Sequence, residues 1–488
     1  MVLRQSYLST IPCRAALLTT GTFLQGLIHV GLKNFSGGRY GDPASQGLSP
    51  RLKELGLELG RLKTGTVPRL LKSSVDYSVM EEQPGDNPPR PFSFDSPGIA
   101  LPQLPCFVTW TTERTHEIIR SGFDRSPMFT GVIKGTGARY CPSIEDKIAR
   151  FPDKDRHQIF VEPEGLTSFE VYPNGIPTSL PLDVQKALVA SIPGLEKAQI
   201  IRPGYAIEYD FVPPTQLRPT LETKAVRGLY LAGQINGTSG YEEAAGQGLW
   251  AAINAVRSLR GEPEFVLTRN QAYIAVLVDD LVTKGTQEPY RMFTSRAEHR
   301  LLLREDNADE RLTPLGREIG LVDDSRWERF TAKQKALREI MAGLESIRVR
   351  PDAATKETVE AMGGTIPQKA VSLKELLRQP ELSIGSLALL WPELAGFDGE
   401  ALEEAEIQAK YEGYLQRQQE LVDRFEKMER TALPEDMVYT GIPGLSREVV
   451  EKLTRIQPRT LGQAGRISGI TPAALSCLEI QLKKMGKI

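Results

Sequence analysis

The stretch GQINGTSGYEEAAGQG, residues 233–248, decides the fold of this chain. It follows the apolar run GLYLA (228–232), opens with glycines and small polar residues, and ends in helix-forming residues. A strand that enters a glycine-rich turn and then a helix presents backbone N–H groups to a cofactor. Glu242 and Glu243 in the first helical turn suit the helix dipole but disfavour a bare phosphate there. The stretch predicts a loop that holds a ribityl chain or flavin edge, although a purely structural glycine turn has the same signature.

The bulk composition describes an ordinary globular protein of several domains. The chain has 488 residues, of which 25% are charged and 40% hydrophobic, and its formal net charge is −2. Nothing in this balance attracts nucleic acid over the whole surface, so such binding requires a local basic patch. The four cysteines, at positions 13, 106, 141 and 477, form no CxxC pair. We therefore expect reduced thiols and no metal site.

The chain changes character near residue 262. Before it, strand-like runs alternate with helical stretches, which is an α/β pattern. The runs are AALLTTG (15–21), CFVTW (106–110), HQIFVEP (157–163) and GLYLAG (228–233). The proline-rich segment 80–98 predicts a surface loop. Beyond residue 263 helical periodicity dominates, with one long amphipathic helix over 407–428 and a last helix capped by Thr471 and Pro472.

The N-terminal 24 residues are basic and contain no acidic residue, which loosely resembles a transit peptide. The run AALLTTG instead predicts a strand that enters a glycine turn and belongs to the fold. We therefore expect a bacterial cytoplasmic protein rather than a mitochondrial one. No apolar run is long enough to cross a bilayer, so no membrane role is expected.

The segment GTGARYCPSIEDKIARF (135–151) carries the cysteine with the best case for reactivity. Cys141 precedes Ser143, a predicted helix N-cap, and lies near Arg139, and both features lower a thiol pKa. A lone cysteine is usually a small buried hydrophobe, and only the nearby arginine and helix start make a reactive thiol an equally good interpretation of Cys141. Cys13, Cys106 and Cys477 lie in apolar runs and are expected in the core.

Three further motifs allow two interpretations each. In LLTTGTF (17–23), a strand enters a turn in which Thr19, Thr20 and Thr22 bind a cofactor or cap the turn. In YRMFTSRAEHRLLLRED (290–306), Arg296, Arg300 and Arg304 recur every four residues and predict one basic helix face, for phosphate or for solvent and salt bridges. In GRLKTGTVPRL (60–70), a Thr-Gly-Thr turn with basic neighbours predicts an anion site or an exposed loop.

Taken together, the motifs resemble one family. GARYCPSIEDK, GRLKTGTVPR, AGQINGTSGYEEAAGQG and EPYRMFTSRAEHRLLLREDNAD are similar to the MnmG/GidA family, the flavoprotein subunit of the enzyme that modifies the wobble uridine of tRNA. The resemblance runs from about residue 15 to the C-terminus. It implies an FAD- and NADH-dependent homodimer that works with a GTPase partner of the MnmE type. Together they add an aminomethyl or carboxymethylaminomethyl group to carbon 5 of the wobble uridine, with methylene-tetrahydrofolate as the one-carbon donor.

The resemblance also implies site residues. Cys141 matches a catalytic cysteine, and Arg291 and Arg300 match tRNA-binding residues, to which the basic pattern adds Arg296. The expected FAD contacts are Gln234, Ser45, Thr20, Gly21, Gly233, Asn236 and Gly237. The expected NAD segment consists of Gly137, Ala138, Arg139, Tyr140, Cys141, Pro142, Ser143, Ile144, Glu145, Asp146, Lys147, Ile148, Ala149, Arg150 and Phe151.

The family pattern implies a definite domain order. The expected fold is α/β, with a partial Rossmann-like FAD domain, an inserted nucleotide-binding domain and a C-terminal all-helical region. The expected boundaries are 1–45 and 201–262 for the FAD domain, 46–200 for the insertion, 263–430 for a tRNA-binding helical domain and 431–488 for a helical subdomain that meets the GTPase and tRNA.

One feature of the family is missing from this sequence. Family members begin with a strand–GxGxxG–helix unit that cradles the FAD pyrophosphate, and no such unit follows a strand here. We therefore expect a fragment, a mis-called start or a decayed copy, with weak FAD binding. Two other functions remain open: a non-catalytic tRNA- or GTPase-binding remnant, and a folate- and FAD-dependent tRNA uracil methyltransferase, against which the helical extension argues.

Overall fold

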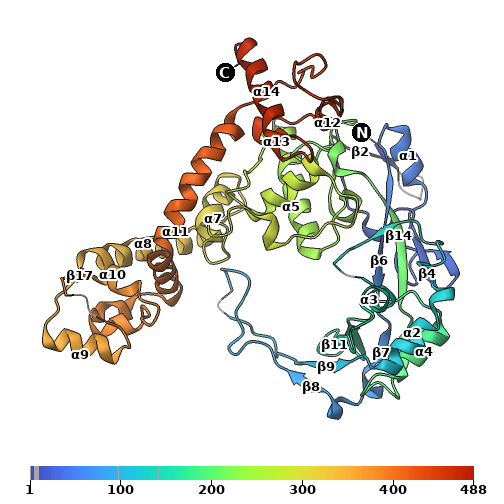
Figure 1. Cartoon of the computed structure of the whole chain (residues 1–488), viewed down its shortest axis with the longest axis horizontal. Helices are drawn as coiled ribbons and strands as arrows, with labels where there is room; N and C mark the ends of the chain where they lie inside the picture. Colours follow the sequence, from blue (N-terminus) through green and yellow to red (C-terminus); the bar gives the residue numbers. More distant parts are fainter. Residues whose placement is uncertain (1, 5–9, 97, 141, 366–367, 488) are drawn as a thin grey trace. The chain divides into compact units, whose positions relative to one another are not determined.

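The chain divides into two compact units in a computed structural model (Figure 1). The structure describes residues 2–4, 10–96, 98–140, 142–365 and 368–487. Unit 1 comprises Met1–Val266 and Leu277–Met292, and unit 2 comprises Leu267–Val276 and Phe293–Ile488. Within the described ranges, no helix is long and apolar enough to cross a membrane.

A mixed five-stranded sheet forms one part of unit 1. Its strand order is β10 (Thr136–Gly137), β6 (Gly60–Thr66), β14 (Tyr205–Phe211), β4 (Leu27–Val30) and β5 (Lys33–Ser36). β10 is parallel to β6, and the other pairs are antiparallel. The sheet therefore brings the segment after residue 134 next to strands far from it in the sequence.

A six-stranded antiparallel sheet lies in the same unit. Its order is β13 (Ile200–Arg202), β7 (Arg69–Leu71), β12 (Glu170–Asn174), β11 (Gln158–Pro163), β9 (Cys106–Trp110) and β8 (Glu81–Gln83). The helices α2 (Glu113–Arg120), α3 (Ile144–Arg150) and α4 (Leu182–Ala190) contribute to its core. Ile119, Ile148 and Leu188 are buried there with Ile159 and Val161 of β11. α2 and α4 lie side by side in Figure 1.

The predicted strand, glycine loop and helix are all confirmed. β3 (Ala16–Leu18) pairs in parallel with β15 (Leu229–Leu231). A 3₁₀ turn follows each strand, η1 (Gly21–Phe23) and η6 (Gly233–Asn236), and α5 (Tyr241–Arg260) follows η6. The run AALLTTG thus belongs to the fold, as its apolar pattern predicts.

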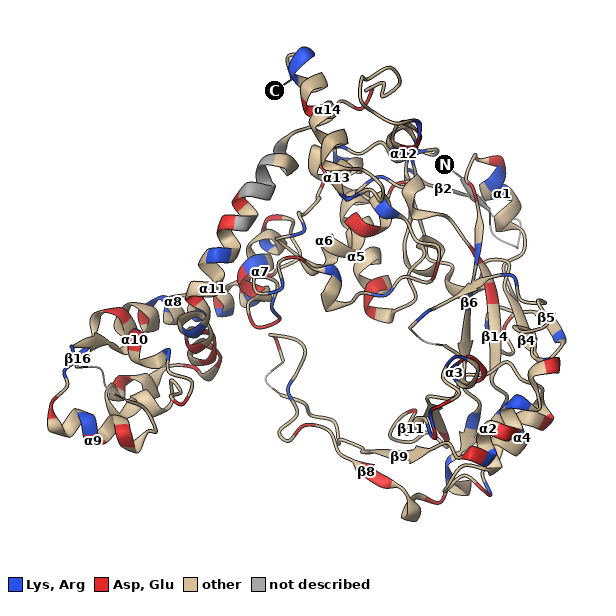
Figure 2. Ribbon diagram, in the orientation of Figure 1, with Lys and Arg blue, Asp and Glu red and all other residues tan. Residues whose placement is uncertain are grey.

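Unit 2 is helical, as its periodicity predicts. Its helices beyond residue 293 are α7 (Ala308–Glu318), α8 (Asp324–Ser346), α9 (Ala353–Ala361), α10 (Leu373–Leu377), α11 (Gly399–Arg430), α12 (Arg447–Ile456), α13 (Leu461–Arg466) and α14 (Pro472–Lys484). The charged residues in the first turns of α11 are all acidic, and basic residues join them from Lys410 onward (Figure 2). One core cluster gathers residues of α8, α10 and α11, and a second gathers residues of α12–α14. Thr471 caps α14, as predicted.

The predicted turn at residues 64–66 is wrong. Thr64, Gly65 and Thr66 form no turn, because they pair with Ile207, Ala206 and Tyr205 of β14 and cross-strand pairing overrides local turn preference. The basic neighbours of this segment form salt bridges with acidic side chains: Arg61 binds Asp210, and Arg69 binds Glu164.

Cys13, Cys106 and Cys477, which were expected in the core, are only partly buried. Cys477 packs against the cluster of α12–α14, and burial raises the pKa of Cys106. Among the described residues of the proline-rich segment 80–98, only 81–83 form a strand, β8, which pairs with β9.

Candidate functional site

Two of the predicted flavin loops lie against each other in unit 1. The Oε1 atom of Gln234 in η6 is 3.5 Å from the position that a Cβ on Gly21 would occupy. Gly21 has φ +57° and Gly233 has φ +85°, in the left-handed region that favours glycine. Turns far apart in the sequence therefore meet at one place, where both need glycine.

Ser45 lies beside the first of these turns. Its backbone N–H donates to the carbonyl of Phe23 at 2.9 Å, and its carbonyl accepts from the N–H of Gln25 at 2.9 Å. The third predicted flavin segment thus joins η1 through backbone hydrogen bonds.

Two buried polar side-chain atoms at the loops make no hydrogen bond within the described part of the chain. Thr20 Oγ1 and Asn236 Oδ1 are both buried, and neither has a hydrogen-bond partner among the described residues. Such atoms carry a desolvation cost until a partner arrives. The Gln247 side chain accepts from the N–H of Gly233 at 2.8 Å and so fixes the turn to α5. Glycine turns with unused donors and acceptors fit the polar ribityl and ring edge of a flavin.

A cavity of about 380 Å³ opens beside β10 and β6. Five residues of the predicted NAD segment line it: Gly137, Ala138, Arg139, Asp146 and Arg150. The other lining residues are Lys63, Met128, Ile133, Gly135, Thr136 and Glu288. Its lining holds three basic side chains, Lys63, Arg139 and Arg150, and two acidic ones, Asp146 and Glu288, of which Asp146 lies 3.5 Å from Arg150. The basic side chains suit a phosphate-bearing ligand.

Other residues of the predicted NAD segment are buried in the protein and stabilise its fold. Ile144 and Ile148 are buried in the core with the six-stranded sheet, and Ser143 caps α3 by accepting from the N–H of Asp146. Glu145 is fully buried and accepts from the N–H and hydroxyl of Ser179 at 3.0 and 2.9 Å.

The remaining members of that segment are more exposed or bind elsewhere. The Lys147 ammonium donates to the carbonyl of Gly175 at 2.8 Å, Pro142 is partly buried, and Ala149 is exposed. Tyr140 and Phe151 are also exposed. Cys141 lies outside the described residues, so its predicted catalytic role stays a prediction.

The basic residues of 290–306 do not share a helix face, and that prediction is wrong. Apart from a 3₁₀ turn at Thr294–Arg296, the segment forms no helix. The buried Arg269 donates to the carbonyl of Arg296 at 3.0 Å and to the Glu298 carboxylate at 2.8 Å. These long-range contacts hold the segment in its non-helical conformation, where tertiary contacts override the local preference for a helix.

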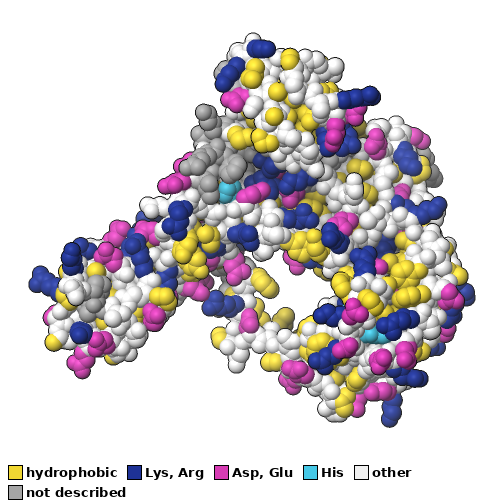
Figure 3. Space-filling model, viewed as in Figure 1, with side chains coloured by type: hydrophobic (Ala, Val, Ile, Leu, Met, Phe, Trp, Pro, Cys, Tyr) yellow, Lys and Arg dark blue, Asp and Glu magenta, His cyan; other side chains and the backbone are white. Residues whose placement is uncertain are grey.

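The predicted tRNA residues fall in both units. In unit 1, Arg291 pairs with the buried Glu243 at 3.2 Å and keeps 45% of its side chain exposed. In unit 2, the Arg296 guanidinium lies 5.9 Å from the centre of the Phe293 ring, and Arg300 is exposed. On the face shown in Figure 3, basic and acidic side chains are interspersed.

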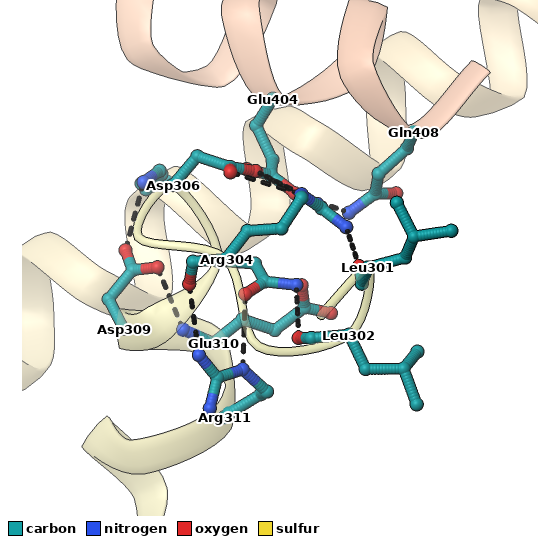
Figure 4. A network of polar contacts seen from close by, with 11 residues as sticks. Leu301, Leu302, Arg304, Asp306, Asp309, Glu310, Arg311, Glu404 and Gln408 are labelled. Carbon is teal, nitrogen blue, oxygen red and sulfur yellow. Dashed lines mark hydrogen bonds and ion pairs between the residues drawn. The ribbon is translucent and has the colours of Figure 1, made fainter. Parts of the chain in front are cut away.

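A buried polar network ties the chain after residue 300 to α11 (Figure 4). Arg304 binds Asp306 at 2.8 Å and lies 3.6 Å from Glu404, which is 4% exposed. Burial, together with the neighbouring Asp306, raises the pKa of Glu404 to about 7. Arg304 therefore forms the salt bridge that its sequence pattern allowed, but it serves the interior of unit 2.

Sequence reasoning missed three buried charges that hold these segments: Arg269, Glu404 and Glu208. Glu208 on β14 is 3% exposed and accepts from His29 Nε2 at 2.9 Å. The available signal was a charged residue inside an apolar strand, YAIEYDF (205–211).

Three family profiles match the chain in order. One described as "Glucose inhibited division protein A" matches residues 2–263. The tRNA modifying enzyme MnmG/GidA C-terminal helical domain matches 324–419, and the C-terminal helical bundle of the same enzyme matches 421–487.

Similar proteins and structures agree with these profiles. A tRNA uridine 5-carboxymethylaminomethyl modification enzyme MnmG from Syntrophotalea carbinolica is 58% identical over 96% of this chain and 76% of its own length. One from Desulfotalea psychrophila is 56% identical over 97% of this chain and 75% of its own length. A crystal structure of Aquifex aeolicus GidA superposes with a TM-score of 0.87 at 44% identity, covering 99% of this chain and 77% of that one. The chain belongs to the MnmG/GidA family of tRNA modifying enzymes.

Proposed function

We propose that this chain is the flavin- and NADH-dependent subunit that adds an aminomethyl or carboxymethylaminomethyl group to carbon 5 of the wobble uridine of tRNA. The observation that carries the proposal is the meeting of Gly21, Ser45 and Gln234 around buried polar atoms, beside a family assignment over nearly the whole chain. The relatives bear the name of that activity. The enzyme would act in a bacterial cytoplasm, where its tRNA substrate is found.

The flavin would bind at the two glycine turns. Thr20, Gly21 and Ser45 would contact it from one side, and Gly233, Gln234, Asn236 and Gly237 from the other. A bound flavin supplies hydride-transfer chemistry.

The cavity at β10 would take the nicotinamide nucleotide. Lys63, Arg139 and Arg150 offer positive charge to its phosphates, while Gly137 and Ala138 let the ligand approach the backbone closely. Cys141 would act at the uridine ring as nucleophile or acid/base. Its role comes from the family resemblance.

The partners follow from the same assignment. The chain would form a homodimer that joins a GTPase of the MnmE type in a heterotetramer. It would bind tRNA through Arg291, Arg296 and Arg300. The residues 431–488 would meet the GTPase and the tRNA. Methylene-tetrahydrofolate would supply the one-carbon unit.

The test uses the purified full chain. A visible flavin spectrum after purification, or after incubation with FAD, supports the proposal. Modified wobble nucleoside, measured by mass spectrometry after incubation with tRNA, the GTPase, NADH and methylene-tetrahydrofolate, completes it. A chain that binds tRNA or the GTPase but takes up no flavin would be the non-catalytic binding protein instead. The matched variant Cys141→Ser separates binding from chemistry, and full activity in that variant would remove the thiol from the mechanism.

A further inference from the structure

The cavity-lining segment begins on a buried carboxylate. Glu208 lies on β14, in the interior of the five-stranded sheet, and is 3% exposed. Its Oε1 atom accepts from the backbone N–H of Lys134 at 2.9 Å and of Gly135 at 2.6 Å. Its Oε2 atom accepts from His29 Nε2 at 2.9 Å. One side chain therefore binds a distant loop and a neighbouring strand together.

This carboxylate is kept ionised by its surroundings. Burial alone would raise the pKa of Glu208, but hydrogen bonds from His29, Gly135 and Lys134 and the charge of Arg61, 3.7 Å away, bring it to about 2. A buried charge is tolerated where its lone pairs are satisfied in this way. Glu208 is therefore ionised, and able to accept the hydrogen bonds of Lys134 and Gly135, over the whole pH range in which an enzyme of this kind is assayed.

The loop fits its anchor tightly. A Cβ on Gly135 would lie 2.9 Å from the backbone of Leu62 and 3.2 Å from Glu208 Oε1, so only glycine allows this approach. The next two residues pair with β6, Thr136 with Leu62 and Gly137 with Lys63. The contact at Glu208 thus sets where the cavity wall from Gly135 to Arg139 begins.

We propose that Glu208 is a positioning residue for nucleotide binding: it fixes the N–H groups of Lys134 and Gly135 and thereby sets the cavity wall that receives the nicotinamide nucleotide. The proposal rests on the proposed function for the identity of that ligand. Glu208 itself does not line the cavity. Its effect on the ligand passes through the loop.

The experiment compares three variants of the full chain, loaded with FAD. Glu208→Leu keeps the bulk and removes the acceptor, Glu208→Asp keeps the charge but withdraws it by one methylene, and Glu208→Gln keeps an acceptor oxygen. Asp210→Asn is the matched control, because Asp210 lies on the same strand and pairs with Arg61 at 2.8 Å. The readouts are amide hydrogen exchange of the peptide that contains Lys134 and Gly135, NADH affinity by titration, and flavin absorbance.

We expect Glu208→Leu and Glu208→Asp to exchange these two amides faster and to bind NADH about tenfold more weakly, with flavin content unchanged. Glu208→Gln restores part of both, and the control changes neither. Unchanged exchange in both variants would overturn the anchor. Faster exchange with wild-type NADH affinity would make Glu208 merely structural and overturn the proposal.

Two further outcomes keep the test decisive. If Glu208→Leu does not fold, judged by circular dichroism, then Glu208→Asp against the control decides between the same outcomes. If the wild-type chain binds flavin but no NADH, the nucleotide part of the proposed function fails, and the positioning role falls with it. Normal NADH binding in the wild type and in every variant would overturn the positioning role of Glu208 and leave the proposed function intact.

Discussion

The amide oxygen of Gln234 lies 3.5 Å from the point where a side chain on Gly21 would begin. This contact joins two turns that each follow a strand of the parallel pair β3 and β15. The ends of parallel strands meet at one edge, where α/β proteins bind their cofactors. The pair therefore defines the place at which flavin binding can be tested residue by residue.

Gly21→Ala should lower flavin content. An alanine at φ +57° costs about 1 kcal/mol, and relaxing that strain moves η1 away from Gln234. Visible flavin absorbance per mole of purified protein measures the loss. Gly248→Ala in α5 is the control, because a Cβ there meets nothing within 4 Å and alanine suits a helix better than glycine. Equal flavin content in both variants would contradict the assignment of this turn.

Thr20→Val should leave the flavin-free protein as stable or more stable, yet it should weaken flavin binding. Without flavin, valine removes a buried hydroxyl that has no partner among the described residues, so unfolding free energy stays equal or rises by about 1 kcal/mol. With flavin, the loss of that hydroxyl should weaken binding about fivefold or more. Urea unfolding of both forms and a flavin titration measure the two effects.

The control for that change lies in the same turn. The Thr22 hydroxyl donates to the carbonyl of Gly38, so Thr22→Val should destabilise the protein whether or not flavin is bound. If Thr20→Val behaves in the same way, the Thr20 hydroxyl has no cofactor to serve.

Local signals in the sequence were sufficient for the flavin loops. Glycine at positive φ, apolar strands and an acidic first helical turn act over a few residues, so the strand–turn–helix order from 228 to 260 could be predicted. The caps at Ser143 and Thr471 are equally local. These elements form where propensity and tertiary contacts agree.

Long-range contacts decided what the sequence could not predict. The arginine spacing of 290–306 favours a helix, yet the segment forms only a 3₁₀ turn and the buried Arg269 binds the carbonyl of Arg296 and the carboxylate of Glu298. The hold of Glu208 on Gly135 joins residues more than seventy positions apart, and no periodicity encodes it. Buried charges that bind partners far away in the sequence were therefore the main feature of the site that the sequence could not predict.

Arg300→Gln should weaken tRNA binding without loss of stability. Arg300 is exposed, and removing one phosphate contact lowers the slope of log affinity against log salt by about one. Lys335→Gln is the control, because that side chain is 73% exposed on α8 and the variant has the same net charge. Filter binding of tRNA across a salt series measures both. A common decrease in affinity would indicate a general charge effect and no contact at Arg300.

Glu404→Gln should remove a pH dependence from the stability of unit 2. Because the pKa of Glu404 is raised from 4.5 to about 7, the folded chain binds more protons than the unfolded chain between these values. Its stability therefore falls as pH rises through that interval, when Glu404 becomes charged beside Asp306. Glutamine stays neutral and can still donate to the Asp306 carboxylate, so the variant should match wild type near pH 4.5 and exceed it above pH 7 by about 1–3 kcal/mol.

Urea unfolding at both ends of that interval measures the difference. Glu406→Gln is the matched control, because Glu406 also lies on α11 but pairs with Lys410 at 2.8 Å and leaves the Asp306–Glu404 contact intact. Its difference from wild type should not grow with pH as that of Glu404→Gln does. If Glu404→Gln destabilises the chain equally at both pH values, the Glu404 carboxylate is ionised throughout, and its contact with Arg304 at 3.6 Å outweighs burial and Asp306.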